Sequence, residues 1–212
     1  MTVSSEKKLF GTATDWRLLG LLFECPSAAT LAELKSLGSE ATNKTLQQAA
    51  AYAQTEADEG LYHLVFGPGG PAPPREVSYR NWVQPGYLLS ELSSYYRAFE
   101  YRPRYSDVPD HIAVEAGFVG YLRLKEAFAL LSDEKENAEI AGEAADRFTK
   151  EHVAEIASPL SKLLAGSGVK YMMLAGEALY ELSGAADLPE RKEMPVIETG
   201  CEEFSCGSEA FV

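Results

Sequence analysis

The sequence of 212 residues has few cysteines and no long apolar run. Three cysteines, Cys25, Cys201 and Cys206, are too few for the disulfide framework that stabilises many small secreted proteins. The apolar segment at residues 18–23 is shorter than the hydrophobic region of a secretory signal peptide, and charged side chains flank it. No run approaches the roughly 20 apolar residues that span a bilayer. We therefore expect a cytoplasmic protein with no membrane span.

Basic side chains are also scarce. The chain has 19 Lys and Arg against 32 Asp and Glu, a formal net charge of −13 at pH 7, and no lysine between Lys44 and Lys125. Proteins that bind nucleic acid or anionic membranes need a basic surface, so neither is an expected partner. The acidity has two interpretations: it attracts a basic peptide or protein, or it only maintains solubility.

The sequence lacks the alternation of apolar and polar residues that is typical of strands, and its apolar residues recur at helical spacing. The fold class that this predicts is all-α, a compact single-domain helical bundle of about eight to ten helices over residues 14–188. A flexible N-terminus (residues 1–13) and an acidic C-terminal tail (residues 189–212) flank it. Caps, prolines and glycines predict helices that begin near residues 14, 27, 42, 56, 85, 109, 134, 160 and 169.

Two prolines set expected boundaries in this pattern. Pro85 suits the first position of a helix, where its missing N–H needs no partner. Pro159 is expected to mark a boundary or bend. The helix at residues 112–131 is apolar on most sides, so we expect it to be central and buried.

One stretch interrupts the helices. Residues 67–74 consist of Gly, Pro and Ala only, which predicts a loop that its prolines stiffen. The stretch lacks the Gly-Lys-Ser/Thr that places a lysine on a phosphate, and no strand precedes it, so a phosphate-binding loop is disfavoured. It is the natural place for a binding site of another kind.

His111 and Glu115 are four residues apart and share a helix face. Only His63 and His152 remain as further histidines, so a metal site is disfavoured. One interpretation is an ion pair or hydrogen bond at a helix start. The other is that Asp110, His111 and Glu115 line a groove beside the loop. No Ser-His-Asp or Cys-His arrangement is apparent, so we expect no catalytic residue, no metal and no cofactor.

Aromatic residues follow the loop at Tyr79, Trp82 and Tyr87. Such residues are most often part of the core, but they also anchor peptides in grooves. In the tail, Cys201 and Cys206 cannot complete a zinc site without ligands from elsewhere. A solvated tail is favoured there over a metal or redox role.

Three segments together resemble the TorD/DmsD/NarJ-type redox-enzyme maturation chaperones, and they are most similar to the TorD-like branch. Residues 61–69 (LYHLVFGPG) resemble the family's Tyr-Leu-Phe segment that runs into Gly-Pro. Residues 72–79 (APPREVSY) are similar to its Pro-Pro, Trp-Glu-Ser and aromatic segment, and residues 108–115 (VPDHIAVE) to its Asp-His helix start. Length and helical layout fit this family over about residues 14–185.

The chain departs from the family pattern at two points. Arg75 stands where the family often has tryptophan, and Val77 and Ser78 reverse the usual order of small and branched residues. An arginine in the groove could change which leader peptide fits.

The resemblance implies a cytoplasmic chaperone that is not an enzyme. It would bind the twin-arginine leader, the apo form, or both, of a molybdopterin oxidoreductase catalytic subunit, assist cofactor insertion and delay export. His111 would orient Asp110 or contact the peptide backbone. The peptide-binding residues that we predict are Glu76, Asp110 and Glu115 for arginine contacts, Tyr79, Trp82 and Tyr87 for apolar contacts, and His111.

Two other functions stay open, a helical adaptor with an unrelated protein partner and an all-α metalloenzyme. The oligomeric state is left between a monomer and a domain-exchanged dimer. The sequence does not identify the client oxidoreductase.

Overall fold

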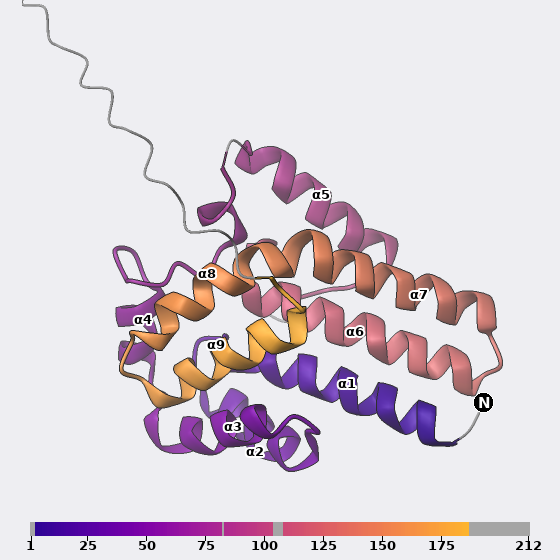
Figure 1. The fold of residues 1–212 in the computed structure, drawn as a ribbon, viewed down its shortest axis with the longest axis horizontal. Helices are drawn as coiled ribbons and strands as arrows, with labels where there is room; N and C mark the ends of the chain where they lie inside the picture. The colour runs from indigo at the N-terminus through magenta and orange to yellow at the C-terminus, as the bar shows by residue number, and fades with distance from the viewer. Residues whose placement is uncertain (1–2, 82, 104–107, 187–212) are drawn as a thin grey trace, which may run out of the picture.

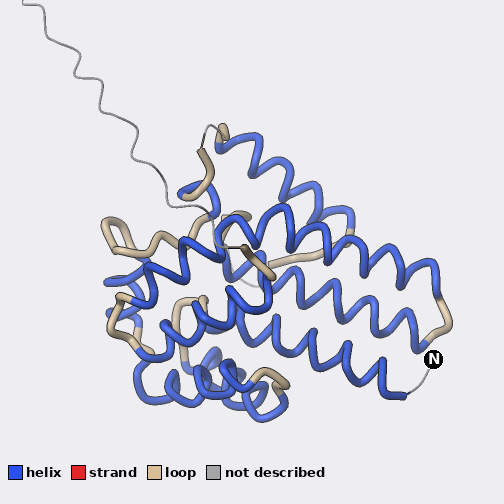
Figure 2. Tube along the Cα trace, in the orientation of Figure 1, coloured by secondary structure: helices blue, strands red, loops and turns tan. Residues whose placement is uncertain are grey.

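The computed structural model describes residues 3–81, 83–103 and 108–186. Within these ranges it contains helices and no strand, so the predicted all-α bundle is confirmed (Figures 1 and 2). The helices are α1 (Val3–Leu22), α2 (Ala28–Glu40), α3 (Lys44–Glu56), α4 (Glu59–Phe66), the 3-10 turn η1 (Glu76–Ser78), α5 (Pro85–Ala98), α6 (Ile112–Leu131), α7 (Lys135–Phe148), the π turn η2 (Thr149–Val153), α8 (Ala154–Ala165) and α9 (Lys170–Ser183).

The first helix begins earlier than predicted. α1 starts at Val3, so a helix start near residue 14 is wrong and the predicted domain boundary after residue 13 falls inside the helix. The cause is tertiary packing, because α1 lies along α6 and its first half contributes to that contact. Ala13 is buried there, and the Phe10 ring meets the Phe128 ring edge-on at 5.5 Å.

Pro159 does not end a helix. It lies inside α8, which continues from α7 through the π turn with helical dihedral angles at both junctions. The α-helical hydrogen-bond pattern is interrupted in that π turn, before the proline, so the predicted boundary at Pro159 is wrong. Such turns place side chains in directions that an α-helix does not offer.

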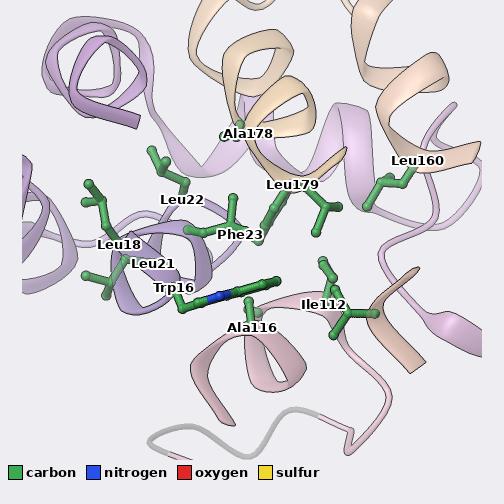
Figure 3. Packing of buried hydrophobic residues seen from close by; sticks show 14 of the residues in the cluster. Trp16, Leu18, Leu21, Leu22, Phe23, Ile112, Ala116, Leu160, Ala178 and Leu179 are labelled. Carbon is green, nitrogen blue, oxygen red and sulfur yellow. The ribbon is translucent and has the colours of Figure 1, made fainter. Parts of the chain in front are cut away.

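Helix α6 lies at the centre of the fold, and its first half is buried as predicted. It packs against α1 on one side and α7 on the other (Figure 1). Figure 3 shows Trp16 of α1 beside Ala116 and Ile112 of α6, and Leu22 on the side of the same core cluster that lies toward Ala178. Two glycines allow the close approach of α1 and α6. A Cβ on Gly20 would lie 3.0 Å from the Ala113 carbonyl, and one on Gly120 would lie 3.0 Å from the Arg17 nitrogen.

Helix α5 stands at the edge of the bundle, above α7 in Figure 1. Its Tyr95 and Tyr96 rings pack on Phe118 of α6 and Phe148 of α7. None of the helices in the described ranges has the length and apolarity that a membrane span requires.

Candidate functional site

The Gly/Pro loop is attached to the start of α6 by backbone hydrogen bonds. The Ile112 N–H donates to the Pro74 carbonyl at 2.9 Å, and the Glu76 N–H donates to the Asp110 carbonyl at 2.8 Å. Gly69 has a φ of 81°, in the left-handed region that glycine adopts without strain. The loop therefore lies directly beside the two residues that precede α6.

Three of the predicted site residues, Glu76, Asp110 and Glu115, lie together inside the protein, and we call them the buried carboxylate cluster. Each is 0% exposed. Charged groups in the interior are costly unless they are paired. Arg75 pairs with Asp110 through contacts of 2.9 Å from both Nε and Nη2, and Arg80 pairs with Glu76.

The third member of the cluster, Glu115, has a different environment. Burial raises the pKa of its carboxyl well above the ordinary value, and the charge of Glu76 raises it further. Neither Glu115 oxygen has a hydrogen-bond partner of standard geometry among the described residues. These conditions favour the neutral, protonated carboxyl at position 115.

The cluster also connects the loop to the π turn. His152, buried in that turn, has its Nδ1 3.2 Å from Glu76 Oε2, and Arg80 donates to the Glu151 carbonyl. Neither Arg80 nor His152 was predicted as a site residue. The spacing of Glu76 and Arg80 by four residues was a visible signal, whereas His152 lies far away in the sequence. A segment that follows the loop is thereby held against α7 and α8.

His111 caps α6. Its Nδ1 accepts a hydrogen bond from the Ala113 N–H at 3.2 Å, so the neutral ring carries its proton on Nε2. Nε2 lies 3.2 Å from the Tyr62 hydroxyl of α4 and donates to it. His111 therefore makes the helix-start hydrogen bond that was one of its two interpretations, and it joins α4 to α6.

Two of the three predicted aromatic contacts, Tyr79 and Tyr87, lie in the described residues and differ in exposure. Tyr79 is half-buried and donates its hydroxyl to the Pro73 carbonyl at 2.7 Å, which braces the loop. Burial raises the pKa of Tyr79 above its ordinary value. Tyr87 is 74% exposed at the start of α5. Trp82, like Cys201 and Cys206, lies outside the described residues.

A second region was not predicted: an apolar groove along α6, which we call the α6 groove. Its first part, of about 370 Å³, lies between α1, α6 and the residues after α5, and its second, of about 640 Å³, between α6 and α7. Tyr121 and Leu124 line both parts, so the two parts are neighbours along α6. Its other apolar lining includes Phe10, Val114, Phe99, Phe128 and Ile140.

The α6 groove exposes large apolar side chains to solvent. Phe128 is 55% exposed and Ile140 is 51% exposed, while Leu131 continues the same face of α6. We expected the whole helix to be buried, and this expectation is wrong for its C-terminal half. Buried residues predominate up to Leu122 and become sparse after it. The neighbouring helices do not cover the C-terminal half of α6, and the second part of the groove lies along it.

Comparison with known proteins identifies the family. A family model described as "Nitrate reductase delta subunit" matches residues 27–158, more than half of the chain. Searches of curated proteins and of solved structures find no match. The matched range includes the Gly/Pro loop, the buried carboxylate cluster and the α6 groove except for the lining residues that precede residue 27. The chain belongs to the nitrate reductase delta subunit family, which comprises NarJ/TorD-type chaperones of molybdoenzyme maturation.

Proposed function

We propose that this protein binds the twin-arginine leader, the apo form, or both, of a molybdopterin oxidoreductase catalytic subunit through the α6 groove. Family membership implies a nitrate-reductase-type molybdoenzyme subunit as the partner. The leader as the contacted segment, assistance to cofactor insertion, delay of export and a cytoplasmic location are parts of the proposal. So is the absence of catalysis, which fits a family of chaperone type.

The exposed apolar lining of the α6 groove is the observation that carries the proposal. Large exposed apolar patches on globular proteins typically mark interaction sites or binding grooves. Leu124 and Phe128 are four residues apart on α6, and Ile140 faces them from α7. Such a groove suits the apolar face of a helix or an extended apolar peptide.

The acidic end of the groove suits the arginines of a leader. α6 ends at Leu131, and the carbonyl groups of a helix C-terminus carry partial negative charge. Asp133 and Glu134 follow soon after; Lys135 pairs with Asp133 at 3.3 Å, and Glu134 lines the groove. We place the twin arginines of the leader at this end and its apolar run over Leu124 and Phe128.

The buried carboxylate cluster then has a positioning role. A leader arginine could reach Glu76 or Asp110 only by displacing Arg80 or Arg75, because both carboxylates are buried and already paired. We therefore assign these acids to fixing the loop against α6. Among the predicted contacts, Tyr87 remains available on the surface.

Calorimetric titration of the full chain with a synthetic twin-arginine leader peptide tests this proposal. Phe128→Asp places a charge in the apolar groove, so we expect at least a tenfold loss of affinity, about 1.4 kcal/mol. Tyr52→Asp is the matched control, since it makes the same kind of change at an exposed ring of α3 outside the groove.

Tyr87→Ser distinguishes the two candidate surfaces. If it weakens the peptide while Phe128→Asp does not, the leader binds beside the loop instead of in the groove. If neither the leader nor the apo catalytic subunit binds the wild-type chain, the function itself is wrong and an unrelated protein partner is favoured.

A further inference from the structure

The turn after α1 brings three metal-binding side chains together at the start of α4. The Cys25 Sγ, a Glu59 carboxylate oxygen and a His63 ring nitrogen all lie within 4.8 Å of one another. His63 Nε2 is 3.7 Å from Glu59 Oε1, because the two residues are one helical turn apart on α4. All three side chains reach solvent, so an ion can enter without opening the fold.

We propose that Cys25, Glu59 and His63 form a zinc site with three protein ligands and an open fourth position. Thiolate, imidazole and carboxylate are the ligand types that zinc takes in proteins. Zinc–ligand distances of about 2.0–2.3 Å put two ligand atoms of a tetrahedral site roughly 3.3–3.6 Å apart. The separations here, all within 4.8 Å, exceed that by about 1.5 Å at most, which side-chain rotations can close.

The surroundings of the site are negatively charged, which favours a divalent cation. Asp58 caps α4 and precedes Glu59 directly. The buried Tyr171 hydroxyl, which has no hydrogen-bond partner among the described residues, lies near the same groups. Burial raises the pKa of Tyr171, and Tyr62, Asp58 and Cys25 raise it further in that order. Asp58 and Glu59 therefore place two carboxylates in succession at the start of α4, at the proposed site.

The position gives the metal a structural consequence. Cys25 follows the end of α1, whereas Glu59 and His63 belong to the helix that leads into the Gly/Pro loop at Gly67. Bound zinc would tie α1 to α4, the helix whose Tyr62 bonds to His111. We expected no metal from the sequence because the chain has few histidines, and no sequence pattern groups Cys25 with Glu59 and His63. The site does not depend on leader binding, so either proposal can fail alone.

The test uses the full chain with Cys201→Ser and Cys206→Ser, which removes the two tail thiols as alternative ligands. Cobalt(II) is added to this metal-free protein as a spectroscopic probe for zinc. We expect one equivalent to produce thiolate-to-cobalt charge-transfer absorption and the visible bands of tetrahedral cobalt, and zinc to abolish both. Zinc should also raise the Tm of this protein.

Substitutions assign the ligands. Adding Cys25→Ser should remove the charge-transfer band and the Tm shift, and adding His63→Asn should weaken cobalt binding at least tenfold. Glu177→Gln, at an exposed carboxyl of α9, is the control that should change neither. The proposal is overturned if the band is absent before Cys25 is changed, if it survives Cys25→Ser, or if binding is weaker than about 1 mM.

Discussion

The buried carboxylate cluster and the α6 groove place side chains in opposite environments. The carboxylates of the cluster are buried, whereas apolar side chains of the groove such as Phe128 are exposed to water. Each arrangement costs free energy relative to the ordinary one. The cluster recovers this cost inside the molecule through Arg75, Arg80 and His152. The apolar side chains of the groove have no comparable compensation in the described part of the chain, and in the proposed function a partner would supply it.

The difference separates positioning from binding. The charged side chains near the loop would attract a ligand if they were exposed, but they are used to join the loop, α6 and the π turn. The α6 groove exposes apolar side chains in the described part of the chain, and it is the surface that we propose for binding. Substitutions in the cluster should therefore change stability first, and substitutions in the groove should change partner affinity first.

The largest expected difference in the free energy of unfolding is between substitutions of two phenylalanines ten residues apart on α6. Phe118 is fully buried among Tyr95, Tyr96 and Phe148, so Phe118→Ala should lower the free energy of unfolding by about 3–5 kcal/mol. Phe128→Ala, in the exposed half of the helix, should change it by about 0.5 kcal/mol or less. Urea unfolding of both variants measures this. Equal losses would show that the groove is part of the core.

Arg80 provides the next test. It is the main charged partner of Glu76, which has no access to water. Arg80→Ala should lower the free energy of unfolding by about 3 kcal/mol, because removing one partner leaves a buried charge uncompensated. Arg97→Ala is the matched control, since among the described residues this exposed arginine of α5 bonds to groups of its own helix. If both variants unfold at the same urea concentration, the Glu76–Arg80 pair is not structural.

Much of the fold could be predicted from the sequence, because helix signals are local. Ser27, Asn43 and Asp58 cap helices through their own side chains, and Pro85 begins one. The extension of α1 to Val3 could not be predicted, since the segment is rich in Ser, Thr and Gly and is held by its packing on α6. Local propensity does not report such packing.

The site was harder to predict than the fold. The segments that form it were identified from motifs, and the structure brings Glu76, Asp110 and Glu115 together. Their burial could not be read from local pattern, because carboxylates are usually exposed and a partner such as His152 comes from a distant helix. Phe128 was misread for the opposite reason: an apolar residue on a central helix is usually covered, and only the arrangement of α1, α6 and α7 leaves it exposed.

The smallest expected effect is on the pH dependence of stability, and it compares the buried carboxyl of Glu115 with an exposed carboxyl. Its folded-state pKa is raised, so the folded protein holds a proton that the unfolded chain releases above its ordinary pKa near 4.5. Any stability from this group is complete below that pH and is lost as pH rises toward the folded pKa, by about 1.4 kcal/mol per pH unit. Glu115→Gln resembles the protonated carboxyl in shape and cannot ionise. Its free energy of unfolding relative to wild type should therefore increase between pH 5 and 7.

The control is Glu91→Gln, at an exposed carboxyl of α5, whose free energy of unfolding should follow a curve parallel to wild type. Urea unfolding across this range measures both variants, and a Glu115→Gln curve parallel to wild type would mean that Glu115 is ionised in the folded protein and that the cluster carries a further negative charge.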